Sequence, residues 1–381
     1  MLKGLSLFSN VGIAETFLDE IGARVVLANE IEENRMAFYK HLYPHCYTIS
    51  GDIRSKEVQS DIVDRSRKLG IDFVIATPPC QGMSLAGKRD PLDPRNQLIT
   101  YAIEVIKKIR PRFVFLENVP QQAKTKIKYK NRILYIPDYI KCELGGDYNF
   151  NENNLVKCMD YSIPQMRARN IFLLSRKDQA LIWEVPPKDK KIITLKVAIG
   201  NLPAVDPIVR EGMDRTIKLF PHFENKQKKA LDHSSFHYPP THAERHIIAM
   251  RHTPSGCTAF DNKIFYPKKP NGEKVSGHYN TYRRHSWDKP CRTIIMNNGV
   301  ISSLCCVHPG RVVNESSDER KRLYSDPRVL TLLEIFIVTT LPVDWNVPNW
   351  ANESLIRNVI GEGIPPLLVK KIFKNLLDKL N

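Results

Sequence analysis

The cysteine at position 80 stands in a segment whose residue types suit covalent chemistry. This segment, Thr77-Pro78-Pro79-Cys80-Gln81-Gly82-Met83-Ser84, directly follows the apolar run Phe73–Ala76, which predicts a buried strand. In open α/β sheets, reactive groups gather beyond the carboxyl ends of the strands, where Cys80 falls. A thiol is nucleophilic as its thiolate, which neighbouring cations or amide dipoles stabilise. A buried, inert cysteine is the alternative, but the two rigid prolines before Cys80 and the looser Gln81-Gly82 after it favour a reactive thiol.

Further groups that can act as acids, bases or cationic supports follow other predicted strands. The run Phe115-Leu116-Glu117-Asn118-Val119 places a carboxyl group near a sheet end, where partial burial suits it to protonate or hydrogen-bond a ring nitrogen. In Gln165-Met166-Arg167-Ala168-Arg169, the two arginines share one side of an extended segment. There they can stabilise the Cys80 thiolate and hold a carbonyl or phosphate group. An exposed strand edge is the alternative for such an arginine pair.

The first predicted strand leads into the turn Leu7-Phe8-Ser9-Asn10-Val11-Gly12-Ile13-Ala14-Glu15. This turn lacks the G-x-G-x-x-G pattern, which disfavours a nicotinamide or flavin dinucleotide, whereas a nucleoside without phosphates makes no such demand. Glu30 ends the second strand, 18 residues after Gly12, where an acid can bind the hydroxyls of a ribose. Asp52 follows a third strand, at the place where the exocyclic amine of an adenine would lie. Each acid alone suits a helix cap or a solvated charge, but the three features in this order indicate a nucleoside site.

Alternating elements position these groups. Strands are predicted at Leu5–Phe8, Arg24–Ala28, Phe73–Ala76 and Phe113–Leu116, and helices at Ile13–Ile21, Ile31–Leu42, Leu98–Ile109 and Leu367–Leu380. This rhythm, with strands that are apolar on both faces, predicts an α/β fold with a Rossmann-like, doubly wound, mostly parallel sheet. From about residue 186 the pattern gives way to short segments punctuated by prolines, which predicts a smaller, loop-rich second lobe.

Basic charge gathers in that second lobe. The chain has a net charge of +16, and residues 186–325 carry 24 basic and 13 acidic groups, against 9 and 10 in residues 1–70. Basic charge gathered in one segment is typical of a surface that binds a polyanion, although a solvated basic face is the alternative.

The composition argues against several other classes of protein. His242 and His246 are four residues apart on a predicted helix, but His-Ala-Glu-Arg-His lacks the zinc-protease pattern, so no metal site is expected. None of the eight cysteines forms a C-x-x-C pair, which favours reduced thiols in a cytosol. The sequence shows no membrane-length apolar run and no cleavage signal after Met1, so a cytoplasmic protein without a membrane partner is expected.

Taken together, these segments resemble the ordered motifs of the cytosine-5 DNA methyltransferases of the prokaryotic restriction–modification type. The resemblance runs from residue 5 to about residue 370 and leaves only part of residues 186–280 unassigned. It rests on Phe8–Gly12, Glu30, Gly51-Asp52-Ile53, Pro78-Pro79-Cys80-Gln81, Glu117-Asn118-Val119, Gln165 with Arg167 and Arg169, Tyr282-Arg283-Arg284, Trp287–Ile294, Arg328-Val329-Leu330-Thr331 with Glu334, Leu341-Pro342 and Ile360–Pro366.

The resemblance implies an enzyme that transfers a methyl group from S-adenosyl-L-methionine to C5 of a cytosine flipped out of duplex DNA. It implies that Cys80 adds to C6 of the ring, Glu117 supplies a proton at N3, Arg169 holds the base carbonyl and Arg167 supports the pocket. The cofactor contacts that it implies are Phe8, Ser9, Val11, Gly12, Glu30, Ile31, Asp52, Ile53 and Pro79.

It also implies how the chain meets DNA. The expected DNA contacts are Gln81, Ser84, Arg95, Arg283 and Arg284, with Ser84 and Arg95 on a loop that closes over the flipped base. Tyr279, Tyr282 and Trp287 are further candidates, although an aromatic residue belongs to a core about as often. Residues 1–185, completed by 352–381, are expected to form the catalytic and cofactor-binding domain, and 186–351 the target-recognition domain and hinge. A monomer is expected, and a cognate restriction endonuclease is a further partner that requires no stable complex.

Three features depart from the family's pattern. In the first motif, which usually has a glycine-rich F-x-G-x-G, Ser9-Asn10 intervene. Glu362 replaces the usual asparagine of the tenth motif, and Lys124–Lys130 is unusually long and basic. Two alternatives remain open: a tRNA cytosine-5 methyltransferase and a catalytically silent protein that binds S-adenosylmethionine or DNA. The first is disfavoured because that branch has a short recognition lobe, and the second because Cys80, Glu117 and the arginines are intact.

Overall fold

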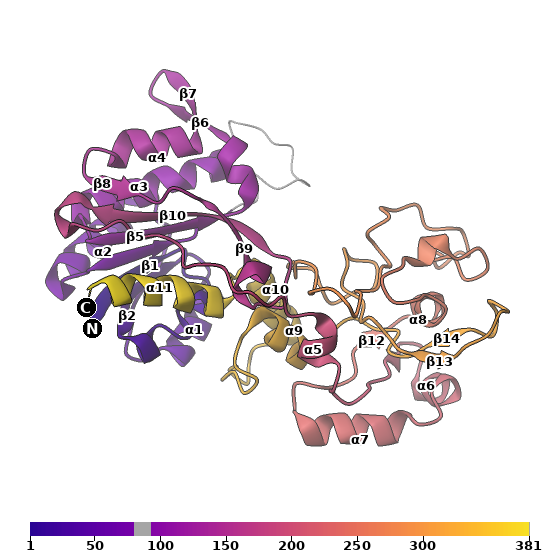
Figure 1. Ribbon diagram of the computed structural model, residues 1–381. Helices are drawn as coiled ribbons and strands as arrows, with labels where there is room; N and C mark the ends of the chain where they lie inside the picture. The colour runs from indigo at the N-terminus through magenta and orange to yellow at the C-terminus, as the bar shows by residue number, and fades with distance from the viewer. Residues whose placement is uncertain (80–92, 381) are drawn as a thin grey trace.

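The computed structural model describes residues 1–79 and 93–380, and within them an eight-stranded sheet forms the centre of the first lobe (Figure 1). The strands run in the order β3-β2-β1-β4-β5-β10-β8, with β9 paired to β10. Strands β1 to β5 are parallel, whereas β10 is antiparallel to β5, β8 and β9. Their bounds are β1 Leu2–Leu7, β2 Ala23–Glu30, β3 Tyr47–Ser50, β4 Phe73–Ala76, β5 Phe113–Asn118, β8 Tyr148–Phe150, β9 Leu155–Lys157 and β10 Ala168–Arg176. The predicted doubly wound, mostly parallel sheet is confirmed.

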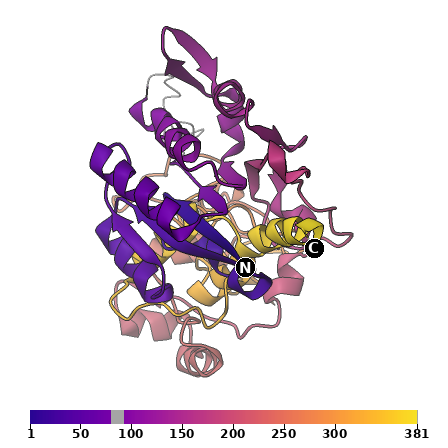
Figure 2. The same cartoon turned by 90° about the vertical axis from the view of Figure 1, so that its left-hand side faces the viewer.

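Helices cover both faces of this sheet because its strands are apolar on both sides. Helices α2 (Lys56–Leu69), α3 (Leu98–Ile109) and α4 (Ile136–Leu144) pack on one face, where Val74 and Ala76 of β4 lie in their core. Helix α11 (Pro366–Leu380) packs on the other, where Phe373 contacts Phe73 at a ring separation of 4.9 Å. Helix α1 (Glu33–Leu42) lies on the same side as α11, and the two chain ends lie side by side in both views (Figure 2).

The helix predicted over residues 13–21 is wrong. The segment forms two short 3-10 turns, Ile13–Glu15 and Asp19–Ile21, held by hydrogen bonds from Glu15 N to Gly12 O and from Ile21 N to Leu18 O. Ile13, Glu15 and Leu18 are all buried, and their spacing of two and three residues suits a tight turn better than a helix with 3.6 residues per turn.

The second lobe consists of short elements joined by long loops, as predicted. Its helices are α5 Leu195–Ile199, α6 Met213–Leu219, α7 Phe223–His233 and α8 Glu244–Arg251, and its two-stranded sheets pair β11 Ile208–Val209 with β12 Thr241–His242 and β13 Val312–Asn314 with β14 Leu323–Tyr324. His242 is therefore on a strand and His246 on a helix, not on one shared helix as predicted. A group of three or more metal-binding side chains is absent from the part of the chain that the structure describes.

Helices α9 (Leu332–Thr339) and α10 (Glu353–Glu362) join the lobes. A buried ion-pair cluster fixes the start of α9: Arg328 is bonded to Asp326 at 2.9 Å and to Glu334 at 2.8 Å, and all three are at most 1% exposed. Thr331 and Glu334 form a capping box there. The core around α9 and α10 also includes Val11. No helix in the described residues is both long and apolar enough to span a bilayer.

Candidate active site

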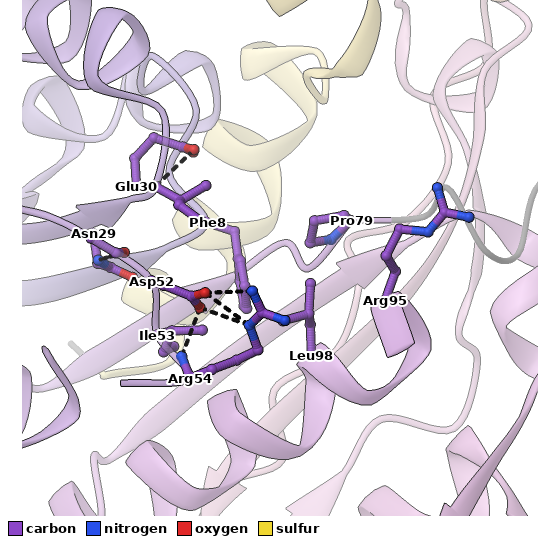
Figure 3. A pocket seen from close by; sticks show the side chains of 11 residues that line it. Phe8, Asn29, Glu30, Asp52, Ile53, Arg54, Pro79, Arg95 and Leu98 are labelled. Carbon is purple, nitrogen blue, oxygen red and sulfur yellow. Dashed lines mark hydrogen bonds and ion pairs between the residues drawn. The ribbon is translucent and has the colours of Figure 1, made fainter. Parts of the chain in front are cut away.

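A cavity of about 260 Å³ opens at the carboxyl ends of β1 to β4 (Figure 3). Strands of a parallel sheet end together at one edge, so residues distant in the sequence converge there. The cavity is lined by Phe8, Asn29, Glu30, Ile31, Gly51, Asp52, Ile53, Arg54, Pro79, Arg95 and Leu98. Its walls are largely apolar, with two carboxylates at the rim, an arrangement that fits a flat heterocycle joined to a hydroxylated sugar.

The turn after β1 forms the support of this cavity. Three of its residues have left-handed backbone: Phe8 (φ 56°), Asn10 (φ 51°) and Gly12 (φ 80°). A Cβ atom on Gly12 would lie 2.3 Å from the Tyr43 ring, whose hydroxyl donates to Gly12 O at 2.6 Å. Only glycine therefore fits this position.

Asn10, which stands where the family has glycine, faces away from the cavity. Its backbone N–H donates to the Glu30 carboxylate at 2.9 Å, and its side-chain amide donates to Val359 O of α10 at 3.0 Å. The asparagine at this position thus ties the turn after β1 to α10, one of the two helices that join the lobes.

Glu30 is oriented entirely by backbone groups. Its carboxylate accepts hydrogen bonds from the N–H groups of Asn10, Ile31 and Glu32 at 2.9 to 3.1 Å. Glu30 is 6% exposed, and it lines the cavity. A carboxylate oxygen has two lone pairs, so these oxygens can accept further hydrogen bonds from ligand hydroxyls.

Asp52 also lines the cavity and is paired with Arg54 (Figure 3). The two side chains form a forked contact at 2.6 to 2.8 Å, and these hydrogen bonds hold the pKa of Asp52 below its usual value. Asp52 is therefore an ionised acceptor at neutral pH, suited to an amine donor.

The nine expected cofactor residues fall into two groups. Six line the cavity, namely Phe8, Glu30, Ile31, Asp52, Ile53 and Pro79. Ser9, Val11 and Gly12 instead form the turn beneath it, and the Val11 side chain is fully buried in the core of the joint. We therefore assign Val11 a packing role.

Glu117 and Arg169 meet near the carboxyl end of β5, the strand that pairs with β4. Arg169 Nε lies 2.5 Å from Glu117 Oε1, and each side chain is 9% exposed. The antiparallel register of β5 and β10 pairs Asn118 with Asn170 and so brings the two charges together. A carboxylate and a guanidinium that are fixed and largely dry can act on a polar ring.

Two hydrogen bonds tie the segment before Cys80 to this pair and to the cofactor turn. Asn118 Nδ2 donates to Pro78 O at 2.9 Å, and the Thr77 hydroxyl donates to Phe8 O at 3.0 Å. The role of Asn118 was not predicted, although its place in Glu117-Asn118-Val119 was a usable signal. The expected site residues Cys80, Gln81 and Ser84 lie outside the described residues.

Arg167 makes different contacts from Arg169, which lies only two residues further along the chain. Its guanidinium donates to Ile294 O at 2.8 Å and to Gly361 O and Glu362 O at 3.0 Å, and the residue is 2% exposed. It therefore joins three distant segments, which agrees with a supporting role.

The expected DNA contacts are placed unequally. Arg95 stands at the mouth of the cavity, paired with Asp93 at 2.6 Å and half-exposed (Figure 3). Arg283 is partly exposed and lies over the ring of Tyr279 at 5.1 Å. The candidate Trp287 is partly buried, and its indole N–H donates to Gly310 O at 2.5 Å.

The expectation that Arg284 contacts DNA is wrong, because its side chain is buried in the second lobe. It is 1% exposed and donates to four backbone carbonyls, those of Met250, His308, Ser325 and Asp326. Tyr282 is likewise a core residue, 4% exposed. Both hold the second lobe together.

Glu362, the second departure, has a partner that the sequence did not reveal. Arg35 of α1 bonds its carboxylate at 2.5 and 3.3 Å, although the two residues are 327 positions apart. Glu362 is thus neutralised locally, and the pair links α10 to α1 beside the cofactor turn.

The chain matches the family model described as C-5 cytosine-specific DNA methylase over residues 2–378. It is 38% identical over 383 residues to the Type II methyltransferase M1.HgaI of Avibacterium volantium, with 99% of each chain covered. It is 24% identical over 389 residues to the Type II methyltransferase M1.HphI of Haemophilus parahaemolyticus, with 100% of this chain and 87% of that one covered.

Among solved structures, the chain is similar to an E. coli protein assigned as a DNA modification methyltransferase encoded within a prophage. The TM-score is 0.66 with 100% of both chains covered, at 21% identity. This likeness shows a shared fold.

Proposed function

Since the chain belongs to the C-5 cytosine-specific DNA methylase family and is a DNA cytosine-5 methyltransferase, we propose that S-adenosylmethionine binds in the cavity beside Glu30 and is the methyl donor. The observation that carries the proposal is the position of Pro79, which lines this cavity and immediately precedes Cys80. The proposed donor site therefore includes the residue that directly precedes the proposed nucleophile in the sequence.

The cavity supplies contacts that suit an adenosyl group. Glu30 accepts hydrogen bonds from the ribose hydroxyls, Ile53 and Leu98 contact the adenine faces, and Asp52 accepts from the exocyclic amine. When bound, S-adenosylmethionine supplies an electrophilic methyl group on a sulfonium. Of the expected contacts, Ser9 and Gly12 act through the shape of the turn.

The chain's own groups activate the cytosine. The thiolate of Cys80 adds to C6 while Glu117 delivers a proton to N3, so that C5 becomes a carbon nucleophile. After C5 has taken up the methyl group it loses its proton to water, N3 returns its proton to Glu117, and expulsion of the Cys80 thiolate from C6 restores the aromatic ring. Arg169 holds Glu117 in place and directs its guanidinium at the base carbonyl, while Arg167 fixes the segment that carries Arg169.

The target base must leave the DNA stack to reach this edge. We assign phosphate and base contacts around it to Gln81, Ser84, Arg95 and Arg283. Residues 186–351, with their excess of basic charge, serve as target-recognition domain and hinge, and residues 1–185 with 352–381 serve as the catalytic domain.

The similarity to Type II methyltransferases supports a role as the modification enzyme of a restriction–modification system. A separate restriction endonuclease would then share the recognition sequence without forming a stable complex with this chain. We infer that the enzyme works as a monomer on cytoplasmic DNA.

A covalent trap tests the proposal. Duplexes that carry 5-fluorocytosine, incubated with S-adenosylmethionine and the protein, should form an adduct that survives denaturation, because fluorine at C5 cannot leave as a proton does. Peptide mass spectrometry should place the adduct on Cys80, and Cys80→Ser should abolish it while leaving cofactor binding unchanged in calorimetry. Trapping at another residue, or methylation of tRNA in preference to duplex DNA, would contradict the proposal.

A further inference from the structure

A basic hairpin projects from the first lobe. It comprises β6 (Lys126–Tyr129) and β7 (Arg132–Tyr135), which pair in antiparallel fashion, and Figure 1 shows it beyond α4 at the outer edge of the lobe. We call residues 124–135, which include the end of the preceding turn, the basic hairpin. Its basic residues, all exposed, are Lys124, Lys126, Lys128, Lys130 and Arg132. The sequence contains no acidic residue between Glu117 and Asp138. None of the five forms an ion pair with the residues that the structure describes.

The hairpin is mounted rigidly, although an isolated two-stranded hairpin has little stability of its own. Ile127 is fully buried in the core under α3 and α4. The Tyr129 ring packs against Tyr139 at 5.0 Å, and its hydroxyl donates to Glu143. The backbone that carries the lysines is therefore held in place and loses little entropy when the hairpin binds a ligand.

The exposed face of the hairpin has the chemistry of a nucleic-acid contact. The strand register places Lys126 opposite Tyr135 and Lys128 opposite Ile133, so these four side chains share one face. Lys126 Nζ lies 5.0 Å from the Tyr135 ring centre, and Ile133 is 59% exposed. Ammonium groups suit phosphates, and the apolar groups between them suit deoxyribose.

The hairpin also lies beside the proposed DNA side of the active site. The Gln97 side-chain amide lies 3.0 and 3.3 Å from the backbone N and O of Lys128, where its oxygen can accept from the N–H and its nitrogen can donate to the carbonyl. Gln97 ends the short helix Pro94–Gln97, which also carries Arg95 at the mouth of the cavity. The basic hairpin therefore continues the surface that begins at Arg95.

We propose that the basic hairpin, residues 124–135, binds the phosphate backbone of the duplex to one side of the target cytosine. The inference rests on the proposed function, because it takes DNA as the substrate. The hairpin adds affinity and a longer footprint without reading sequence, since phosphate contacts position a protein on DNA and carry no base information.

The test compares two triple variants of the full chain with equal loss of charge. The hairpin variant is Lys126→Gln, Lys128→Gln, Lys130→Gln. The control variant is Lys40→Gln, Lys68→Gln, Lys374→Gln. These three lysines are exposed and lie on α1, at the distal end of α2 and on α11, respectively. Binding is read by fluorescence anisotropy over a range of salt concentrations, without turnover. Methyl transfer is followed on a long duplex and on duplexes trimmed from each side in turn.

The hairpin variant should lower the slope of log affinity against log salt by about 3, because each phosphate contact contributes about 1. Its KM for the long duplex should rise on the order of tenfold with kcat unchanged, and trimming one side alone should remove the difference from the unmodified protein. Hydroxyl-radical protection on that side should be lost.

A hairpin variant that matches the control variant in salt slope and footprint would overturn the inference. Absence of methyl transfer by the unmodified protein would instead contradict the proposed function, while the anisotropy data would still decide whether the hairpin binds DNA.

Discussion

The Arg169 guanidinium lies 2.5 Å from the Glu117 carboxylate, in a setting where each side chain is 9% exposed. The two residues come from neighbouring antiparallel strands, β5 and β10, so the sheet itself sets their separation. Two opposite charges taken largely out of water each depend on the other. Substitutions at this pair therefore separate its chemical role from its structural one.

Glu117→Gln should lower kcat by a factor of about 10² to 10⁴, because an amide cannot deliver the proton to N3. The amide is about the same size and its oxygen can still accept a hydrogen bond from Arg169, so the free energy of unfolding should fall by less than in Arg169→Ala, and the Kd of S-adenosylmethionine should change little. Arg169→Ala should in addition lower the free energy of unfolding by about 3 to 5 kcal/mol, since it leaves a buried carboxylate unpaired. Single-turnover transfer and urea unfolding measure the two effects. If Glu117→Gln transferred methyl groups within fivefold of the unmodified rate, Glu117 would not be the proton donor.

Asp52→Ala should raise the Kd of S-adenosylhomocysteine about tenfold, as expected for a lost hydrogen bond to a charged group that is partly solvated. The analogue with inosine in place of adenosine lacks the exocyclic amine. It should bind the unmodified protein more weakly than S-adenosylhomocysteine does but bind Asp52→Ala equally well. Calorimetric titration of both ligands provides the comparison. Equal discrimination by the two proteins would mean that Asp52 does not contact the amine.

Arg283 and Arg284 are neighbours in the sequence but should respond oppositely to substitution. Arg283→Ala should weaken DNA binding and lower the salt slope by about 1, with stability unchanged. Arg284→Ala should lower the free energy of unfolding by about 3 kcal/mol or more, because four backbone carbonyls lose their donor. Burial lowers the pKa of Arg284 to about 9. Thermal unfolding and anisotropy titrations of each variant check this, and a stable Arg284→Ala protein would refute the packing role.

Glu15 makes stability depend on pH. Burial raises its pKa from the usual 4.5 to about 7, and the hydrogen bonds of Ser6 and Tyr39 lower it only in part. An acid whose pKa is higher in the folded state takes up protons on folding, so its contribution to stability is present below pH 4.5 and is lost as pH rises to about 7. Glu15→Gln should therefore gain about 3 kcal/mol over the unmodified protein between pH 4.5 and pH 8. Urea unfolding at both pH values measures this gain, and a constant difference would contradict it.

The sequence predicted those elements whose pattern is local. Strand Phe73–Ala76 and helix Leu98–Ile109 begin and end where expected, because an apolar run marks the first and an amphipathic pattern ended by Arg110 and Pro111 marks the second. Six of the expected cofactor residues line the cavity because each ends or follows a strand in the parallel part of the sheet. That topology alone carries them to one edge.

Features that depend on tertiary packing were beyond the pattern. Nothing in an Arg-Arg pair tells which member the backbone of residues 250, 308 and 325 will enclose, so the expected DNA contact of Arg284 is wrong. The bond between Arg35 and Glu362 spans 327 residues and has no local signal. The sequence predicts a helix after β1 because the apolar residues there are spaced as on a helical face, whereas the packing of Gly12 against Tyr43, which holds the turn, has no local signal.

Helix α11 closes one face of the sheet, yet it is made after the whole second lobe. Synthesis proceeds at roughly 5 to 20 residues per second. The apolar surface around Phe73 and Phe115 therefore stays exposed for on the order of ten seconds or longer, until the second lobe and then α11 have emerged from the ribosome. During that interval the nascent catalytic lobe exposes apolar surface. Chaperones that bind such surface should therefore bind this protein until α11 has left the ribosome and packed on the sheet.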